Sequence, residues 1–362
     1  MSVDASLVFY VVMFSIAALL MWWGISRKSK LIVGFSLIIP ILLSALRFNV
    51  GTDYSNYVLM FKDLSLVPFD QYFTQVFPKI EIGFYALIKL SSWITNGPFL
   101  MFLGSSALIV LFFYFGLKKY NLKHPSLIYF LYLMVIFPTT LNGIRQGIAA
   151  AICFYAITFI ISRRPGKYLL WVFIASLFHI SALFLAPLYL LNIVIKGKNE
   201  ESLTKILLIF SAVAVAMLMA LPYLFEVLAT VPIFETYVQY LVPVNDGTDS
   251  GLYSKLAITA IVIIAAKWVI PRTEKNKYNY FIVFALLEVL ISTIGFSATI
   301  DRMALYFSFF SLFLIANFAN VFKDTLGKIV VYSFIIIYGI AYFYLAYYVQ
   351  NYGDVMPYQL IG

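Results

Sequence analysis

The sequence predicts an all-α, polytopic integral membrane protein, with about 12 transmembrane helices in a single domain over residues 1–362. Two observations predict this class. Of the 362 residues, 63% are hydrophobic and only 11% are charged, whereas an ordinary soluble domain carries about 25% charged residues. Apolar runs long enough to cross a ~30 Å hydrocarbon layer also recur along the whole chain. Helices are expected because they satisfy every backbone hydrogen bond within one segment.

The predicted segments follow one another with short polar breaks. The first, in "MSVDASLVFYVV", has no basic region before it and no cleavage pattern, so we expect a retained helix and not a signal peptide. The apolar segments are 5–24, 31–46, 82–96, 98–117, 126–141, 143–161, 168–178, 180–195, 203–228, 253–270, 278–299, 302–320 and 329–348.

The positive charges predict the orientation of these segments. Six basic loops, from "SRKSK" to "KDTLGK", hold 18 of the 25 Lys and Arg residues, which places them in the cytoplasm. Most acidic residues fall in the other loops, 11 of 16. Both termini and two extracytoplasmic loops, 47–80 and 229–252, are then outside. The net charge of +9 is thus an orientation signal, and we expect no nucleic-acid partner.

One part of this topology is inconsistent with the assigned sides of the membrane. Two apolar segments, 82–96 and 98–117, lie between an outer loop and the basic loop "KKYNLKH", where a single crossing is required. Either the short segment 82–96 is re-entrant or interfacial, or "KKYNLKH" lies outside.

Polar residues that are unusual in a membrane protein gather on the predicted outer face. Such groups are costly in lipid and usually face the bundle interior or a wet cavity, so we expect an outer-face cavity. They are Arg47, Glu81, Arg145, His179, Asp301 and Arg302.

The stretch "LNGIRQGIAAAICF" places Arg145, with Asn142 and Gln146 beside it, at the start of a helix. A cation is unfavourable at that end of the helix dipole. A bound anion would reconcile the two, because helix N-termini and arginine forks both suit phosphate. A lipid-linked phosphate or diphosphate is the expected ligand at this depth.

Structural interpretations compete with this one. Each arginine could be an interfacial anchor, Arg302 could pair with Asp301, and His179 could be a packing residue. Glu81, Tyr85 and Lys89 are four residues apart and could form a local stripe on one helix face. For Glu288, which is placed mid-segment, we expect a bridge between two helices. These alternatives remain open at this point.

Several function classes are excluded or disfavoured. No Gly-rich loop followed by Lys-Ser/Thr occurs, which argues against an ATP-driven pump, and no HExxH motif occurs. The single cysteine, Cys153, is mid-helix, so no disulfide is available. With two histidines, one cysteine and no DxD motif, we expect no metal site and no cofactor.

Four motifs occur in order: "LRFNVGTDYSNY" (46–57), "EIGFYALIKL" (81–90), "NGIRQGIAAAI" (142–152) and "SLFHISALF" (176–184). Together they resemble the EpsG branch of the Wzy-type bacterial polysaccharide polymerases. The motifs cover the first half of the chain. The second half resembles the family only in hydropathy and in the pair Asp301-Arg302.

The resemblance implies a metal-independent glycosyltransferase of the bacterial cytoplasmic (inner) membrane, with its active site facing outside. We expect it to invert the anomeric carbon in a single displacement, since no pair of nucleophiles is evident. Its partners would be undecaprenyl-diphosphate-linked oligosaccharides as donor and acceptor, membrane lipid, and a chain-length regulator and flippase as candidates. The implied product is an O-antigen, capsule or exopolysaccharide. The residues implied in catalysis are Asp53, Glu81, Arg145 and His179, and those implied in binding diphosphate and sugar are Arg47, Tyr54, Tyr57, Asn142, Gln146, Asp301 and Arg302.

As a mechanism, we hypothesise that Arg145 and Arg47, with Arg302, hold the donor diphosphate. The base that takes the acceptor proton is Asp53, Glu81 or His179. Two other functions stay open. One is a ligase that moves a finished glycan to another acceptor. The other is a non-enzymatic transporter or flippase of lipid-linked sugars, which would require polar residues at the bilayer midplane.

Overall fold

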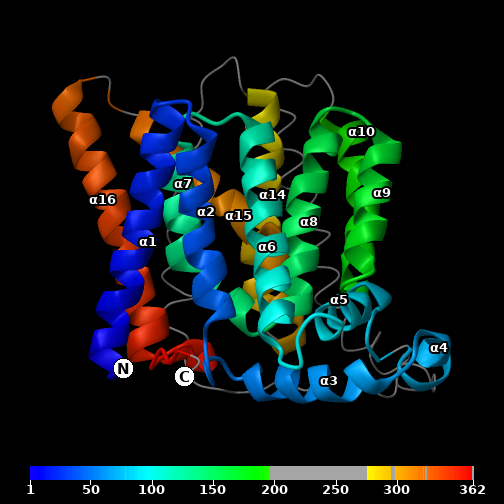
Figure 1. Cartoon of the computed structure of the whole chain (residues 1–362). Coiled ribbons are helices and arrows are strands. Elements are labelled where there is room, and N and C mark those ends of the chain that lie inside the picture. Colours follow the sequence, from blue (N-terminus) through cyan, green and yellow to red (C-terminus); the bar gives the residue numbers. More distant parts are fainter. Residues whose placement is uncertain (78, 196–274, 295–297, 321, 323, 361–362) are drawn as a thin grey trace. The chain divides into compact units, whose positions relative to one another are not determined.

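The computed structural model describes residues 1–77, 79–195, 275–294, 298–320, 322 and 324–360. These residues form helices and connecting loops, without a strand in the described part. They divide into two compact units: residues 1–188 with 322–362, and residues 189–321. Figure 1 shows the helices of both units.

The first two helices of the first unit are an antiparallel pair. Helix α1 (Val3–Ser26) begins at Ser2, whose side chain accepts a hydrogen bond from the Ala5 N–H, and α2 (Lys30–Ala45) begins at Ser29 in the same way. Satisfying a free N–H of the first turn favours a helix start at these positions. Gly24 lets the two helices meet closely, because a Cβ there would lie 2.7 Å from the Val33 side chain.

The other long elements of this unit pack side by side with that pair. Helix α6 contacts α2 and α8, α8 contacts α9, and α7 contacts α1 and α16. Helix α7 continues through a π-helical and a 3₁₀ stretch to Leu141. The bounds are α6 Phe99–Tyr120, α7 Pro125–Leu131, α8 Ile144–Ile161, α9 Pro165–Ser176, η4 Ile180–Leu190 and α16 Thr325–Phe343, which continues as η8 Tyr344–Val349.

A layer of short helices lies across one end of these elements. It contains α3 (Tyr54–Leu66), α4 (Tyr72–Gln75) and α5 (Ile82–Ser92). Figure 1 shows α3 running crosswise at the end where the N- and C-termini lie. At 1.5 Å per residue, the 11 residues of α5 span about 16 Å, which is too short for a crossing. The interpretation of segment 82–96 as re-entrant or interfacial therefore fits, and α6 alone provides the crossing.

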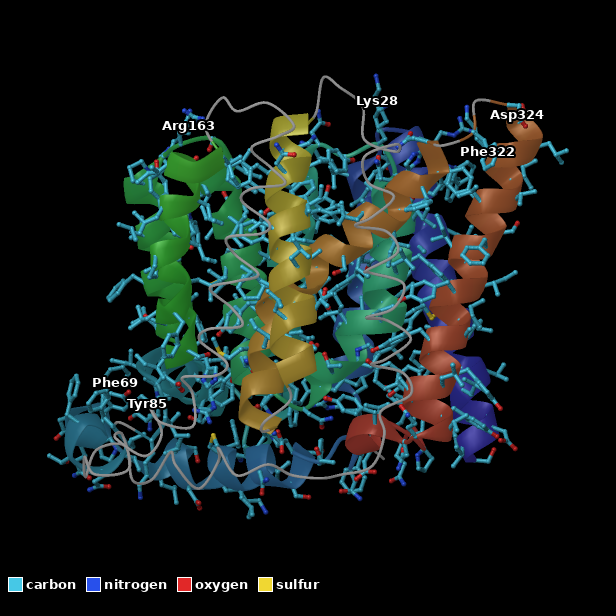
Figure 2. The ribbon with its side chains drawn as sticks, turned by 180° about the vertical axis from the view of Figure 1, so that it is seen from behind. Lys28, Phe69, Tyr85, Arg163, Phe322 and Asp324 are labelled. Atoms are coloured by element: carbon cyan, nitrogen blue, oxygen red, sulfur yellow. The ribbon has the colours of Figure 1, made fainter. Side chains whose placement is uncertain are left out.

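The basic loops of this unit lie at the opposite end. Figure 2 shows Lys28 and Arg163 at one end, and Phe69 and Tyr85 at the other. The loops α1–α2, α6–α7 and α8–α9 are all at the basic end (Figure 1). The charge asymmetry that we read as an orientation signal is thus a real asymmetry of the fold.

The protein is a multi-pass membrane protein, but the expected 12 crossings are not confirmed. In the described part, five helices are long and apolar enough to cross a membrane: Val3–Ser26, Phe99–Tyr120, Ile144–Ile161, Arg302–Asn320 and Thr325–Val349. Shorter apolar helices are Lys30–Ala45, Ile82–Ser92, Pro125–Leu141 and Ile180–Ile193. The predicted segments 203–228 and 253–270, and the predicted loop 229–252, lie outside the described residues.

The second unit contains α10 (Leu191–Ile195), α14 (Lys275–Ile294) and α15 (Ala298–Asn317). Phenylalanines pack between α14 and α15, and Glu288 is buried among them, where its carboxylate accepts a hydrogen bond from the Ser311 hydroxyl. Glu288 therefore links two helices, which is the structural role expected for it.

Candidate functional site

The central feature of the site is the carboxylate of Glu81, which joins two other predicted residues. Its Oε2 lies 2.6 Å from Nη1 of Arg145, and its Oε1 lies 3.0 Å from Nδ1 of His179. The backbone N–H of Ile180 also donates to Oε1, at 3.1 Å. Three motifs that are far apart in sequence thus meet in one cluster, which we call the Glu81 cluster (Glu81, Arg145 and His179).

Each member of the Glu81 cluster lies at the end of a helix. Glu81 directly precedes α5, Arg145 is in the first turn of α8, and His179 follows α9. Such positions place side chains at the end of the bundle, where α3 and α5 also lie (Figure 1). The three members of the Glu81 cluster are therefore at the end of the first unit opposite its basic loops.

Gly83 brings α5 against the end of α9. Its N–H donates to the carbonyl oxygen of Leu177 at 2.7 Å. A Cβ at residue 83 would lie 2.6 Å from that oxygen, so a larger residue would separate the two segments. Because Glu81 is two residues before Gly83 and His179 is two residues after Leu177, this contact sets the distance between the carboxylate and the imidazole.

The Glu81 cluster is partly open to solvent. The exposed fractions of the side chains are 12% for Glu81, 24% for Arg145 and 28% for His179. Desolvation raises the pKa of Glu81, but the hydrogen bond from His179, the charge of Arg145 and the Ile180 N–H together lower that pKa below its ordinary value. Glu81 is therefore a carboxylate at neutral pH.

This arrangement explains the arginine at the start of α8. The positive end of the helix dipole disfavours a cation, and the Glu81 carboxylate supplies the compensating negative charge from within the chain. The contacts of Arg145 with Glu81 and with the Lys79 carbonyl both use Nη1. A guanidinium carries further donors on Nη2 and Nε, which could reach an anionic ligand.

The same contact fixes the hydrogen on His179. An ionised carboxylate only accepts hydrogen bonds, so the Nδ1 of His179 that lies 3.0 Å from Glu81 carries the hydrogen. In the neutral imidazole, Nε2 then has the free lone pair. Histidines that act as general bases are commonly oriented in this way by a carboxylate at Nδ1.

Tyr57, a predicted binding residue, faces the start of α8. It is buried, and its hydroxyl interacts with the backbone amides of Ile144 and Arg145. Burial raises the pKa of Tyr57 against the lowering effect of the Arg145 charge, and Asp53 raises it further. Tyr57 thus lies beside the helix start at which we predicted a phosphate ligand, and that ligand stays a prediction.

Arg47 is enclosed by the protein. Its side chain is fully buried, and its Nη2 donates to the carbonyl oxygen of Leu141 at 2.6 Å. The guanidinium lies 5.0 Å from the ring centre of Phe102 and 6.0 Å from that of Tyr54, and these two rings stack on each other. The predicted contact of Arg47 with a diphosphate stays a prediction.

The remaining predicted residues lie in different surroundings. Gln146 is buried in α8, and Asp53 is half-buried just before α3. Asn142 bonds to backbone groups of other segments. Asp301 and Arg302 belong to α15 of the second unit, and the side chain of Asp301 lies outside the described part. Among the described residues, no three His, Cys, Asp or Glu side chains form a group that could hold a metal ion.

Comparison with known proteins identifies the family. The sequence model of the EpsG family matches residues 30–360. The chain belongs to the EpsG family. The match covers both units, including the second half of the chain, where the sequence motifs gave little signal. Neither the search of curated proteins nor the search of solved structures gave a match.

Membership of the EpsG family indicates a polysaccharide polymerase-like activity of the glycosyltransferase type, and lipid-linked sugars as the general class of substrate. The resemblance that the four motifs suggested is thereby confirmed.

Proposed function

We propose that this EpsG-family chain joins undecaprenyl-diphosphate-linked oligosaccharide repeat units at the outer face of the bacterial cytoplasmic membrane. The growing glycan would pass from its lipid diphosphate to the sugar end of a new lipid-linked unit. The observation that carries the proposal is the Glu81 cluster. It combines an oriented histidine with an arginine fork in a partly exposed position, at the end opposite the basic loops.

In the proposed reaction, His179 is the general base. Its Nε2 takes the proton from a hydroxyl of the acceptor sugar, and the acceptor oxygen forms a bond to the anomeric carbon of the donor. The bond from that carbon to the diphosphate oxygen breaks, and undecaprenyl diphosphate leaves with the electron pair. A single displacement of this kind inverts the anomeric configuration.

Glu81 would position His179 and stabilise its positive charge. The carboxylate already accepts hydrogen bonds from Arg145, His179 and the Ile180 N–H. A carboxylate that is bonded in this way is a weak base, because each bond stabilises the ionised form. Among the three predicted bases, His179 is therefore favoured over Glu81, and Asp53 is the alternative.

Arg145 would stabilise the leaving group. As the donor bond breaks, negative charge grows on the diphosphate, and a preorganised donor aimed at that charge typically contributes about 10²–10³-fold in rate. The partial exposure of Arg145, 24%, leaves it accessible to such a ligand. The proposed activity uses neither a metal nor a cofactor.

The test is a polymerisation assay with purified protein in lipid and a lipid-linked repeat unit. The proposal expects a ladder of products, and loss of that ladder in His179→Gln. His124 is the matched control, because it lies at the basic end, where it contacts Tyr332; His124→Gln should polymerise normally. A single addition to a foreign acceptor would indicate a ligase, and no product at all would favour a transporter.

A further inference from the structure

Leu141 and Asn142, shortly before the start of α8, are held by two distant parts of the chain. The carbonyl oxygen of Leu141 accepts a hydrogen bond from Arg47 at 2.6 Å. The side chain of Asn142 uses both ends of its amide: Oδ1 accepts from the Asp53 N–H at 3.4 Å, and Nδ2 donates to the Gly353 carbonyl oxygen at 2.8 Å.

Two glycines make the space for this amide. Gly51 and Gly353 both have positive φ, +98° and +71°, which only glycine adopts easily. A Cβ on Gly51 would lie 2.5 Å from Oδ1 of Asn142, and a Cβ on Gly353 would overlap Nδ2. Conformation and space therefore both require glycine on each side of Asn142.

Backbone hydrogen bonds continue this contact from Gly353 toward the C-terminus. The N–H of Gly51 donates to the Asp354 carbonyl oxygen at 2.8 Å, and that of Thr52 donates to the Gly353 carbonyl oxygen at 3.1 Å. Further along, the Phe48 N–H donates to the Gln359 carbonyl oxygen at 2.8 Å. Residues 353–359 thus pair with the motif loop 47–54, with Asn142 between them.

We propose that Asn142 is a positioning residue, which clamps residues 351–360 and the loop 47–54 to the start of α8. Both ends of its amide are bonded to the protein backbone, which argues against the sugar contact first expected for it. Arg145 follows Asn142 by three residues, so the clamp on Asn142 fixes the position of the Arg145 guanidinium. The effect on catalysis rests on the function proposed above, whereas the clamp itself can be tested without substrate.

The substrate-free test uses cysteine labelling in a Cys153→Ala background. Val355 is 1% exposed, so the Val355→Cys variant should react slowly with a membrane-impermeant maleimide. Adding Asn142→Ala should release residues 351–360 and raise that rate at least ~10-fold. Gln359 is exposed, so the Gln359→Cys variant is the matched control and should label at the same rate with and without Asn142→Ala.

The activity test separates positioning from substrate contact. Misplacement of a binding group by about 1 Å can cost ~10²-fold in rate, so Asn142→Ala should lower kcat by ~10–10²-fold with KM nearly unchanged. Gly353→Ala should do the same. Because both changes break one clamp, the double variant should lose little more than Asn142→Ala alone.

Three results would overturn the proposal: unchanged labelling at position 355, increased labelling with unchanged kcat, or a raised KM with unchanged kcat, which would make Asn142 a substrate contact. If the unmodified chain makes no polymer, the proposed function fails. The labelling result then decides the clamp by itself.

Discussion

Replacing Glu81 by Gln keeps the shape of the side chain and removes its charge. Glu81 has one oxygen for Arg145 and another for His179 and the Ile180 N–H. A glutamine has a single acceptor oxygen, so its amide nitrogen must face donors on one side. If the oxygen faces Arg145, the nitrogen opposes Nδ1 of His179 and favours the wrong tautomer. If the oxygen faces His179, the nitrogen opposes Arg145.

The size of the effect follows from the bonds lost. A hydrogen bond to a charged group is worth about 1.5–3 kcal/mol, and either orientation of Gln disrupts one or two of them. The loss is then about 1.5–6 kcal/mol in the transition state, which corresponds to ~10–10⁴-fold in rate. A histidine base that loses its orienting carboxylate falls in the same range, at ≈10⁴ in serine proteases. We therefore expect Glu81→Gln to lower kcat by ~10–10⁴-fold.

The assay is the rate of ladder formation at saturating lipid-linked repeat unit, with protein amounts matched after reconstitution. Asp63 is exposed on α3, so Asp63→Asn removes the same charge outside the Glu81 cluster and is the control. The Glu81→Gln variant should still insert and fold, because Glu81 lies at the end of the bundle. If Glu81→Gln keeps its kcat within ~3-fold of the unmodified chain, the carboxylate does not orient the base.

Three further predictions concern charge, pH and orientation. Arg145→Lys keeps the charge but loses the bidentate guanidinium, so we expect intact insertion and a ~10²-fold loss of polymerisation. The control Arg163→Lys, at the basic end, should polymerise normally. Near-normal ladders in Arg145→Lys would show that Arg145 is only an interfacial anchor. The pKa of Glu81 is lowered in the folded state. The ionised carboxylate therefore stabilises the fold at pH values above its unfolded-state pKa of about 4.3, and this stabilisation is lost as the pH falls through the folded-state pKa. The difference in Tm between the unmodified chain and Glu81→Gln should therefore be largest at neutral pH and disappear as the pH falls through the lowered pKa of Glu81. A difference that persists when Glu81 is protonated contradicts the ion pair. In a cysteine-free background, the Asp70→Cys variant should label from outside and the Lys28→Cys variant only from inside, and the reverse pattern would invert the proposed site.

The long helices could be predicted closely from the sequence. The expected segments 98–117 and 143–161 correspond to Phe99–Tyr120 and Ile144–Ile161, because an apolar run of bilayer length has one way to satisfy its backbone. The short segment 82–96 was ambiguous, since length alone does not separate an interfacial helix from a crossing one. The structure favours the interfacial alternative.

The members of the Glu81 cluster were identifiable one by one, as ionisable residues near predicted helix ends. Their pairing was not, because residues 64 and 98 positions apart share no spacing rule. Arg47 shows the opposite limit. Its charge suggested a contact with the donor diphosphate but did not show that the stacked rings of Tyr54 and Phe102 and a backbone carbonyl enclose it. Such an enclosure depends on tertiary packing, which a single sequence does not display.

The hydrogen bond between Asn142 and Gly353 spans 211 positions of the chain, and this separation has a consequence for biosynthesis. Helices inserted early can pack against their neighbours during translation, but Asn142 cannot make this hydrogen bond until Gly353 has been synthesised. Contacts of high sequence separation form late, since the intervening chain must first be ordered. The nascent protein would therefore reach the membrane with the start of α8 not yet clamped, and the proposed activity would begin only after synthesis of residues 351–360.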